Sequence, residues 1–379
     1  MLISLFIGSS IALLAPPLFY YLWMKNKAKM PWGLALDSGF EPEVTLIIAT
    51  FNEASVIAEK LGNVQTLDYH QGKLQVIVVD SASTDGTLDV CKTFLKTSNP
   101  RFQTSLLSEN ERLGKAHALN FALQYAKGEI IATSDADSFW EPDALRKAVS
   151  FFADPIVGAV TGREELLNLK KSVHTQSEGM YRKFYYALRI GESKIHSTLI
   201  FQGELSLYRR SAFESFEDRP GYSDDIGTIV KMVSNQHRCI FVPEAVFHDT
   251  AAFSLRGRLT LKSRRAQHLV AGIIESTSLK IRGKLPLSSA IVAFNFYMHV
   301  LSPFLLALAL ISFVFVLVIG FQVFWFLMLP LCFLLLFNKS RLLTISYLTS
   351  NLALTIGLMR HITRRKGTTW RKVEEMRTS

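Results

Sequence analysis

Two aspartates stand one residue apart after a short apolar run, in the segment GEIIATSDAD. The run Ile130–Ala132 has the length and composition of a buried strand, which predicts that Asp135 and Asp137 follow it into a loop. Two carboxylates this close repel each other unless a cation neutralises them. Their oxygens suit Mg²⁺ or Mn²⁺, which one or two carboxylates bind and substrate phosphates complete. The pair alone leaves a second interpretation open, a solvated turn whose aspartates accept hydrogen bonds from nearby backbone amides.

Strands and helices are expected to alternate around this segment. Near-continuous apolar runs predict strands at Val44–Thr50, Leu74–Asp80 and Gln103–Leu107. Helices are expected at about Ala54–Leu67, Thr87–Lys96 and Lys115–Ala126. Buried strands that are each followed by a helix predict an α/β domain with a mostly parallel sheet flanked by helices. Ligands of such sheets bind at the carboxyl ends of the strands.

The expected carboxyl edge of this sheet gathers charged side chains. Six of them lie at or just after a strand end or at a helix start: Glu53, Asp80, Asp85, Lys115, Asp135 and Asp137. Five acids beside one lysine favour a phosphate ligand only when a divalent cation is present. A diphosphate then fits, because Lys115 at a helix amino terminus neutralises a further charge, and Asp80 could accept from a ring N–H of a base. Taken singly, these residues also fit roles as turn, cap or solvated helix residues, so it is their shared position that indicates a site.

Four segments occur in order along the chain: VTLIIATFNE, VIVVDSASTDGT, GKAHALNFAL and GEIIATSDAD. In this series the chain resembles the nucleotide-sugar-binding half of the family 2 glycosyltransferases, which have the A-type fold. The resemblance is to the group of ceramide glucosyltransferases, polyprenyl-phosphate sugar transferases and polysaccharide synthases. It covers residues 43–270, which we expect to form one glycosyltransferase domain. Four motifs in order are far more specific than any one of them.

The resemblance implies a role for each residue of the edge. It assigns the donor site to Thr50, Glu53, Asp80, Ser83, Lys115, Asp135 and Arg264. In the family, the residues at Thr50, Glu53 and Asp80 hold the base of the nucleotide sugar. The residues at Asp135 and Asp137 ligate the Mn²⁺ or Mg²⁺ that holds the donor diphosphate.

An acceptor side is expected further along the chain. Phe201–Arg210 resembles the family's acceptor-side strand, and Gly221–Val233 places Asp224 and Asp225 at an expected helix start. Acids there also cap a helix and complement its dipole. The resemblance implies that the second acid, Asp225, is the general base toward an acceptor hydroxyl, opposite the leaving diphosphate. If the acceptor is a lipid phosphate, which is already ionised at neutral pH, Asp225 would only position it.

Leu259–Thr277 is expected to form a basic helix. Many relatives carry Gln-x-x-Arg-Trp at this point, and the matching residues here are Lys262, Arg265 and Ala266. Arg265, catalytic by this resemblance, keeps the charge that would meet the donor diphosphate, next to Arg264. The tryptophan that packs against the acceptor sugar in polymerising relatives is missing, which favours transfer of one sugar. The arginines also fit a basic face beside a membrane.

The apolar residues of the chain are concentrated toward its ends. Of 379 residues 49% are hydrophobic, and segments 1–24 and 286–338 contain no Asp, Glu, Lys or Arg. The first is expected to be an uncleaved transmembrane anchor, because its lysines follow the apolar stretch. The second is long enough for two transmembrane helices. Residues 342–359 form a third apolar segment, which is interfacial, re-entrant or spanning.

Basic residues lie beside these apolar segments. We expect a basic interfacial linker at 271–284 and a basic tail at 360–379. The net charge of +10 therefore indicates contact with a membrane and not with nucleic acid. The positive-inside tendency predicts a multi-pass protein of the cell membrane with its catalytic domain in the cytoplasm. Three cysteines without disulfide or metal-ligand spacing fit a reducing compartment.

Together these features predict a membrane-bound, metal-dependent, inverting glycosyltransferase. It would move a hexosyl or N-acetylhexosaminyl group from a nucleotide sugar to a lipid or lipid-linked acceptor at the cytoplasmic face. A UDP-sugar is the first candidate for the donor. The nearest alternative is a processive polysaccharide synthase of the hyaluronan, chitin or cellulose synthase type, but two or three spans leave little room for a polymer channel. A nucleotide-binding transporter or receptor would need charges or Gly and Pro breaks inside the spans. A nucleotidyltransferase would need a Gly-rich phosphate loop, which ATFNEAS is not.

Overall fold

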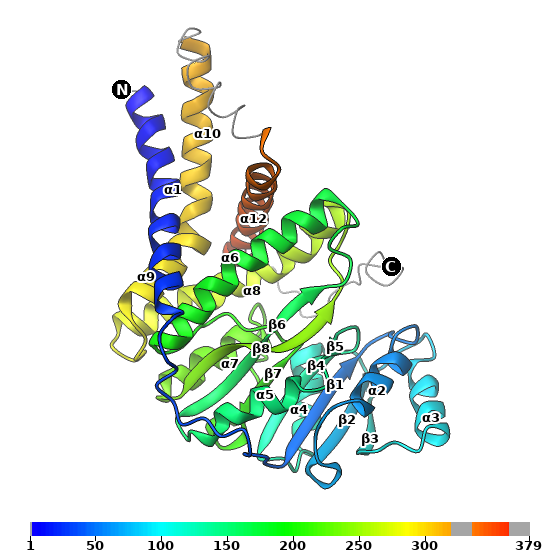
Figure 1. The fold of residues 1–379 in the computed structure, drawn as a ribbon. Coiled ribbons are helices and arrows are strands. Elements are labelled where there is room, and N and C mark those ends of the chain that lie inside the picture. The colour runs from blue at the N-terminus through cyan, green and yellow to red at the C-terminus, as the bar shows by residue number, and fades with distance from the viewer. Residues whose placement is uncertain (1, 320–335, 364–379) are drawn as a thin grey trace.

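A mixed β-sheet organises the middle of the chain (Figure 1). The computed structural model describes residues 2–319 and 336–363. Within this part of the chain the strands lie side by side in the order β3-β2-β1-β4-β7-β6-β8-β5. Their bounds are β1 Val44–Thr50, β2 Leu74–Ser81, β3 Gln103–Glu109, β4 Ile130–Asp135, β5 Phe139–Trp140, β6 Val157–Leu166, β7 Ser206–Arg209 and β8 Arg238–Asp249.

Helices pack on both faces of the sheet and extend away from it. Their bounds are α1 Leu2–Lys27, α2 Ile57–Gln65, α3 Thr87–Thr97, α4 Lys115–Leu123, α5 Ala144–Val149, α6 Val173–Ile195, α7 Asp224–Ser234, α8 Leu255–Ile281, α9 Ser289–Phe296, α10 Ser302–Ile319 and α12 Asn338–Ile362. Short 3₁₀ turns η1 Gln71–Lys73, η2 Ser150–Ala153 and η3 Arg210–Ala212 join some of them, and a π-helical turn, η4 Tyr297–Leu301, joins α9 to α10.

The expected α/β class is confirmed, but the sheet is mixed. Strands β3, β2, β1 and β4 are parallel, as the alternation of strand and helix predicts. Beyond them β7 is antiparallel to β4 and to β6, β8 is parallel to β6, and β5 is antiparallel to β8. Strands β5 and β8 were not predicted from the sequence. Because β8 carries Pro243 and polar residues near its end, its sequence lacks the continuous apolar pattern of β1 and β2.

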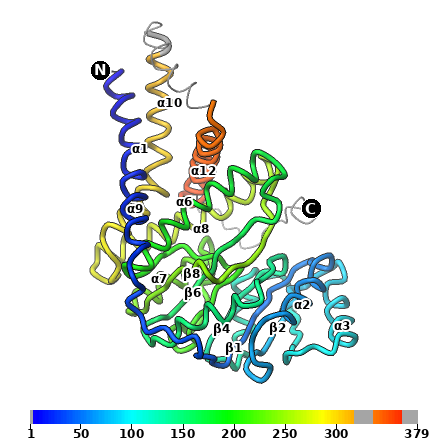
Figure 2. Tube along the Cα trace, in the orientation of Figure 1, coloured from blue at the N-terminus to red at the C-terminus, as the bar shows by residue number. Residues whose placement is uncertain are grey.

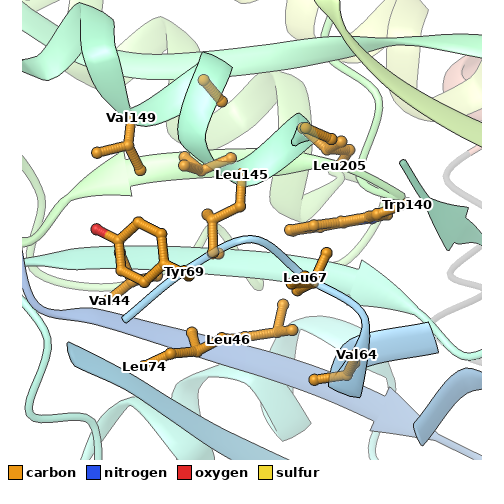
Figure 3. Packing of buried hydrophobic residues seen from close by; sticks show 14 of the residues in the cluster. Val44, Leu46, Val64, Leu67, Tyr69, Leu74, Trp140, Leu145, Val149 and Leu205 are labelled. Carbon is orange, nitrogen blue, oxygen red and sulfur yellow. The ribbon is translucent and has the colours of Figure 1, made fainter. Parts of the chain in front are cut away.

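Strand β1 is buried on both faces, which explains its continuous apolar sequence. Leu46 and Ile48 pack in one hydrophobic cluster with residues of α2 and α5, whereas Ile47 packs in a second cluster with α4, α7 and α8. Figure 3 shows the first cluster, in which Trp140 and Leu145 lie over the strand that carries Leu46. The two clusters fix the strand, so its carboxyl end is held at a defined place.

Long apolar helices stand on one side of the sheet domain. In the described chain the helices Ile3–Lys27, Ser289–Val316 and Asn338–Ile362 are long and apolar enough to cross a membrane. Figures 1 and 2 show α1 and α10 side by side, with α12 next to them and α6 and α8 between these helices and the sheet. The second of the three runs without a break through α9, η4 and α10.

The expected segments map onto these helices as follows. The anchor 1–24 lies within α1, and the segment 342–359 lies within α12. Of the two helices expected in 286–338 the structure describes the first, and residues 320–335 lie outside the described residues, as do residues 364–379 of the expected basic tail. The expected linker 271–284 continues α8 to Ile281 before a short turn. Which of these helices cross a membrane stays a prediction.

Two glycines let the long helices approach at backbone distance. A Cβ on Gly191 of α6 would lie 2.8 Å from Cα of Met24 in α1. A Cβ on Gly357 of α12 would lie 2.7 Å from the carbonyl carbon of Ala266 and 2.8 Å from its Cβ, in α8. Small residues at such crossings allow close van der Waals contact between helices. The sheet domain is therefore packed directly against the apolar helices.

We expect the substitution Gly357→Val to destabilise the protein by about 1–3 kcal/mol, because the new side chain would force α12 away from α8. Thermal unfolding in nanodiscs measures this as a lower midpoint. Gly8→Val in α1 is the control, since a Cβ there meets no atom within 4 Å. Equal midpoints for the two variants would contradict the packing described here.

Candidate active site

Polar side chains form a cluster at the ends of β1 and β2. Thr50 and Asp80 are register partners at the ends of the two parallel strands. The hydroxyl of Thr50 donates to the carbonyl of Val79 at 3.0 Å, and Asp80 accepts from the backbone N–H of Ser83 at 3.1 Å. Ser83 in turn accepts from the backbone N–H of Asn52 at 2.8 Å. The structure therefore brings together three of the residues expected to hold the donor nucleotide.

Asp85 has a structural role beside this cluster. Its carboxylate accepts from the N–H and the hydroxyl of Thr87, at 3.0 and 2.5 Å, at the start of α3. Its other oxygen accepts from the N–H of Ala54 at 3.1 Å, and the N–H of Glu53 donates to Thr87 at 2.7 Å. Asp85 thus fixes the turn that carries Glu53, a buried acid that lines the neighbouring cavity. This agrees with the turn-and-cap interpretation of Asp85.

Lys115 connects the expected metal pair to the expected acceptor acids. It is the first residue of α4, and its Nζ donates to Oδ1 of Asp135 at 2.5 Å and lies 3.9 Å from Oδ2 of Asp224. Burial acts to raise the pKa of Asp135, but Lys115, with Arg265 and Arg264, holds it below its usual value. Asp135 is therefore a carboxylate at neutral pH.

Several acids converge next to Asp135 around a cavity of about 80 Å³. Asp137, Glu204 and Asp249 line it with Asp135. Burial, followed by the charges of Asp137 and Glu204, raises the pKa of Asp249 well above its usual value. A divalent cation at Asp135 and Asp137 would reduce this repulsion, and carboxylate oxygens suit Mg²⁺ or Mn²⁺.

The ligand set is incomplete without substrate. Within the described residues no group of three or more His, Cys, Asp or Glu side chains is arranged to hold a metal by itself. Magnesium and manganese commonly take only one or two carboxylates and complete their shell with water and phosphate oxygens. Asp135 and Asp137, expected as ligands, therefore suit a cation that binds together with a diphosphate.

A buried lysine supports the loop of the acid pair and was not predicted from the sequence. Lys60 of α2 is fully buried, and its Nζ donates to Oγ of Ser134 at 2.7 Å and to the carbonyl of Ser138 at 2.5 Å. Burial lowers the pKa of Lys60 to about 7, although the nearby charges of Asp135 and Asp137 oppose this. The two hydrogen bonds hold Ser134 and Ser138, which lie on either side of the acid pair, to the same ammonium group.

Asp225 faces the large cavity as an unpaired carboxylate. The start of α7 is capped by Ser223, whose Oγ accepts from the N–H of Asp225 at 3.1 Å, so Asp225 does not cap its own helix. Its buried Oδ1 has no hydrogen-bond partner among the described residues. Burial and the neighbouring charge of Asp224 raise the pKa of Asp225 well above its usual value, against the effect of Lys115. A carboxylate with a raised pKa and a free oxygen is suited to accept a proton.

Gly203 makes room for this carboxylate. A Cβ at Gly203 would lie 2.7 Å from Oδ1 of Asp225 and 3.0 Å from Nζ of Lys115. The next residue, Glu204, accepts from Nη2 of Arg265 at 2.7 Å. The segment before β7 thus contacts both Asp225, the expected base, and Arg265 of α8.

The arginines of α8 lie at the junction of the two cavities. Arg264 and Arg265 line both the small cavity and the large one, which measures about 1280 Å³. The carboxylate of Glu204 raises the pKa of Arg265, whereas burial and the charge of Arg265 lower the pKa of Arg264 to about 10. Both guanidinium groups stay charged at neutral pH, beside Asp135. That they meet a donor diphosphate stays a prediction from the sequence.

Three residues of the site were missed at the sequence level: Lys60, Glu204 and Asp249. Asp249 could have been found from the sequence, because it is an acid at the carboxyl end of a strand, β8, as Asp135 is at the end of β4. Glu204 follows the glycine of the segment FQGELS but precedes its strand, so no strand-end rule finds it. Lys60 lies in the middle of a helix, where its sequence resembles that of any solvated lysine.

Comparisons with known proteins fit this arrangement. Residues 45–216 match the sequence profile of Glycosyl transferase family 2. A solved mannosyltransferase from Pyrobaculum calidifontis, in complex with GDP-Man and Mn²⁺, superposes with a TM-score of 0.83 at 33% identity, over 97% of this chain and 100% of that one. This chain belongs to glycosyl transferase family 2, and the resemblance based on four motifs is confirmed.

Curated relatives cover only part of the chain. An N-acetylglucosaminyltransferase from Bradyrhizobium diazoefficiens is 28% identical over 240 residues, which are 60% of this chain and 48% of that protein. A beta-monoglucosyldiacylglycerol synthase from Synechocystis is 32% identical over 138 residues, 36% of this chain and 29% of that protein. The match to the first of them thus spans about half of its length.

We expect Lys60→Met to weaken Mn²⁺ activation by about 10–100-fold, the usual effect of removing a group that orients metal ligands. Ser134 and Ser138 would lose their shared donor, and the acid-pair loop would lose its support. Activity titrated against Mn²⁺ measures the shift. Lys92→Met, at an exposed position of α3, is the matched control, and an unchanged Mn²⁺ requirement in Lys60→Met would refute the role.

We expect Gly203→Ala to lower kcat by about 100-fold, since small displacements of reacting groups have effects of this size. The added methyl would displace both Asp225 and Lys115. Steady-state kinetics measures kcat, and tryptophan fluorescence or thermal unfolding verifies folding. Gly62→Ala in α2, where a Cβ meets no atom within 4 Å, should retain the original kcat.

Proposed function

We propose that the protein is a membrane-bound, metal-dependent, inverting glycosyltransferase that moves one sugar from a nucleotide sugar to a lipid or lipid-linked acceptor. The observation that carries this proposal is the position of Asp225. Its unpaired carboxylate lies in the same cavity as the ion pair of Lys115 and Asp135, so a base and a diphosphate-binding edge meet in one space.

The residues suggest the course of a single displacement. Asp225 accepts the proton of the acceptor hydroxyl, whose oxygen attacks the anomeric carbon from the side opposite the diphosphate. The bond from that carbon to the diphosphate oxygen breaks, and its electron pair leaves with the diphosphate, which inverts the configuration. Lys115, Arg264 and Arg265 are placed to stabilise the charge that develops on the leaving group. A divalent cation at Asp135 and Asp137 would supply Lewis-acid stabilisation of the same charge.

We assign the donor to the nucleoside diphosphate sugars, with a UDP-sugar as the first choice. Asp80 at the end of β2 can accept from a ring N–H of uracil or of guanine. The relative from Pyrobaculum calidifontis was crystallised with GDP-Man and Mn²⁺, which supports metal use and makes a GDP-sugar the competing donor. An assay that offers both nucleotides decides between them.

We assign the acceptor to lipids on the cytoplasmic side of the membrane. The large cavity is lined by His299 and by residues of α12, which belong to helices long enough to span a bilayer. One relative is named a beta-monoglucosyldiacylglycerol synthase. Lys25 and Lys27 in the last turn of α1, with Lys29 just after it, favour a cytoplasmic catalytic domain by the positive-inside tendency.

The contact between α8 and α12 supports transfer of one sugar over processive synthesis. Ala266 stands where polymerising relatives carry the tryptophan, and it is buried against Gly357 of α12. An indole at this position would have to displace α12 or project into the large cavity, which Ala266 also lines.

The proposal is tested with membranes that contain the protein and a panel of labelled UDP- and GDP-sugars. We expect label to enter the organic phase with one donor, to require Mn²⁺ or Mg²⁺, and to fall by roughly 100-fold or more in Asp137→Ala, since metal stabilisation of the transition state is worth several kcal/mol. Asp143→Ala, an exposed acid paired with Lys147, is the control and should retain activity. Label in a long water-soluble polymer, or transfer that is indifferent to chelator, would refute the proposal.

A further inference from the structure

The large cavity extends from the candidate base to the apolar helices. Its volume of about 1280 Å³ exceeds the roughly 300–1,000 Å³ that is usual for a small-molecule pocket. Lys115 and Asp225 line one end, and His299 of η4 lines it together with Ala353 and Leu354 of α12. An acceptor that enters between these helices can reach the base without leaving the cavity.

Arg189 of α6 is a buried cation in the wall of this cavity. The residue is only 9% exposed, and its Nε and Nη1 have no hydrogen-bond partner in the described part of the chain. Its guanidinium lies 6.0 Å from the ring centre of Phe241. Glu192, one turn further along α6, already accepts hydrogen bonds from three other side chains. The charge of Arg189 acts on Glu192, but no acid among the described residues accepts a hydrogen bond from these two nitrogens. Unsatisfied N–H groups on a buried guanidinium are costly, so this wall is suited to a negatively charged ligand.

The acid on the same wall is already neutralised by other cations. Glu178 lies 3.1 Å from Arg258 and 3.0 Å from Lys262. Arg360 of α12 also lines the cavity and adds a positive charge. The charge of Arg189 is therefore not balanced by the acid of this wall, and an incoming anion would balance it.

Arg189 is set back from the candidate base along α6. Arg182, seven residues earlier, pairs with Glu164, which also accepts from Gln202, the neighbour of the glycine beside Asp225. Seven helical residues span about 10 Å, so Arg189 lies this much further along the axis of α6 than Arg182. A ligand that contacts both the base and Arg189 therefore carries its anionic group apart from its reacting hydroxyl.

We propose that the acceptor is a lipid that carries a phosphate or diphosphate between its apolar chain and the sugar or polyol with the attacking hydroxyl, and that Arg189 binds this phosphate. The inference rests on the proposed glycosyl transfer and names its acceptor class. A phosphate that was itself the nucleophile would have to lie at Asp225, and a neutral glyceroglycolipid would bring no anion to Arg189. Guanidinium binds phosphate oxygens through two parallel N–H donors, which lysine cannot reproduce.

The test measures binding of farnesyl diphosphate to the full chain in phosphatidylcholine nanodiscs. We expect Arg189→Gln to weaken binding by about 10–100-fold, the effect of losing a charge-assisted hydrogen bond, and Arg189→Lys to weaken it less. Lys183→Gln removes the same charge from an exposed position of α6 outside the cavity and should bind like the unmodified protein. Farnesol and inorganic pyrophosphate should both bind more weakly than farnesyl diphosphate by about tenfold or more, since each lacks one half of the ligand.

Three outcomes overturn the proposal: equal binding of the probe by the unmodified protein and Arg189→Gln, equal binding of farnesol and farnesyl diphosphate, or displacement of the probe when the nanodiscs contain phosphatidylglycerol. The last outcome would identify a site for bulk membrane lipid. Metal-dependent binding of nucleotide sugars is measured in parallel. Its absence from the unmodified protein contradicts the proposed function, whereas its persistence in Arg189→Gln shows that the variant is folded and that a loss of probe binding is local.

Discussion

The ammonium of Lys115 holds the two sides of the candidate active site together. It bonds Asp135 at the end of β4 and lies 3.9 Å from Asp224 at the start of α7, so one cation serves acids that are distant in the sequence. Without it, burial would drive these carboxylates to take up protons, because unpaired charges are not tolerated in a protein interior. Strand β7 lies beside β4, and the segment before β7 brings Gly203 next to this ammonium. Because Gly203 has no side chain, it leaves space for the ammonium and the acids around it.

The donor half of the fold could be predicted from the sequence because its determinants are local. Buried parallel strands need continuous apolar residues, and the helix after each strand follows within a few positions, so β1 and β2 were found with their ends nearly correct. The strand predicted at Ile130–Ala132 was found too, but β4 continues to Asp135, which was wrongly expected in the loop. Once the strand ends are known, the parallel order brings Asp80 and Asp135 to one edge. The role of Asp225 depended on family resemblance, and the structure adds that Ser223, and not Asp225, caps α7.

The rest of the site depends on contacts between distant segments, which no local pattern reports. Strand β8 pairs with β6, about 80 residues earlier in the chain, and only this pairing brings Asp249 to the acids of the small cavity. Arg189 resembles any basic residue of an amphipathic helix until α12 packs against α6 and the large cavity forms beside it. The sequence shows that Ala266 replaces the tryptophan of polymerising relatives, but the approach of Gly357 to Ala266 appears only once the helices are packed.

The approach of Gly191 to Met24 has a mechanical consequence. Because α6 rests against α1 at backbone distance, and α6 also forms a wall of the large cavity, a tilt of α1 moves that wall directly, with no flexible linker to absorb it. Helices that span a bilayer adjust their tilt to its thickness. In the proposed membrane placement, a change in bilayer thickness that tilts α1 would therefore be transmitted to the wall of the large cavity.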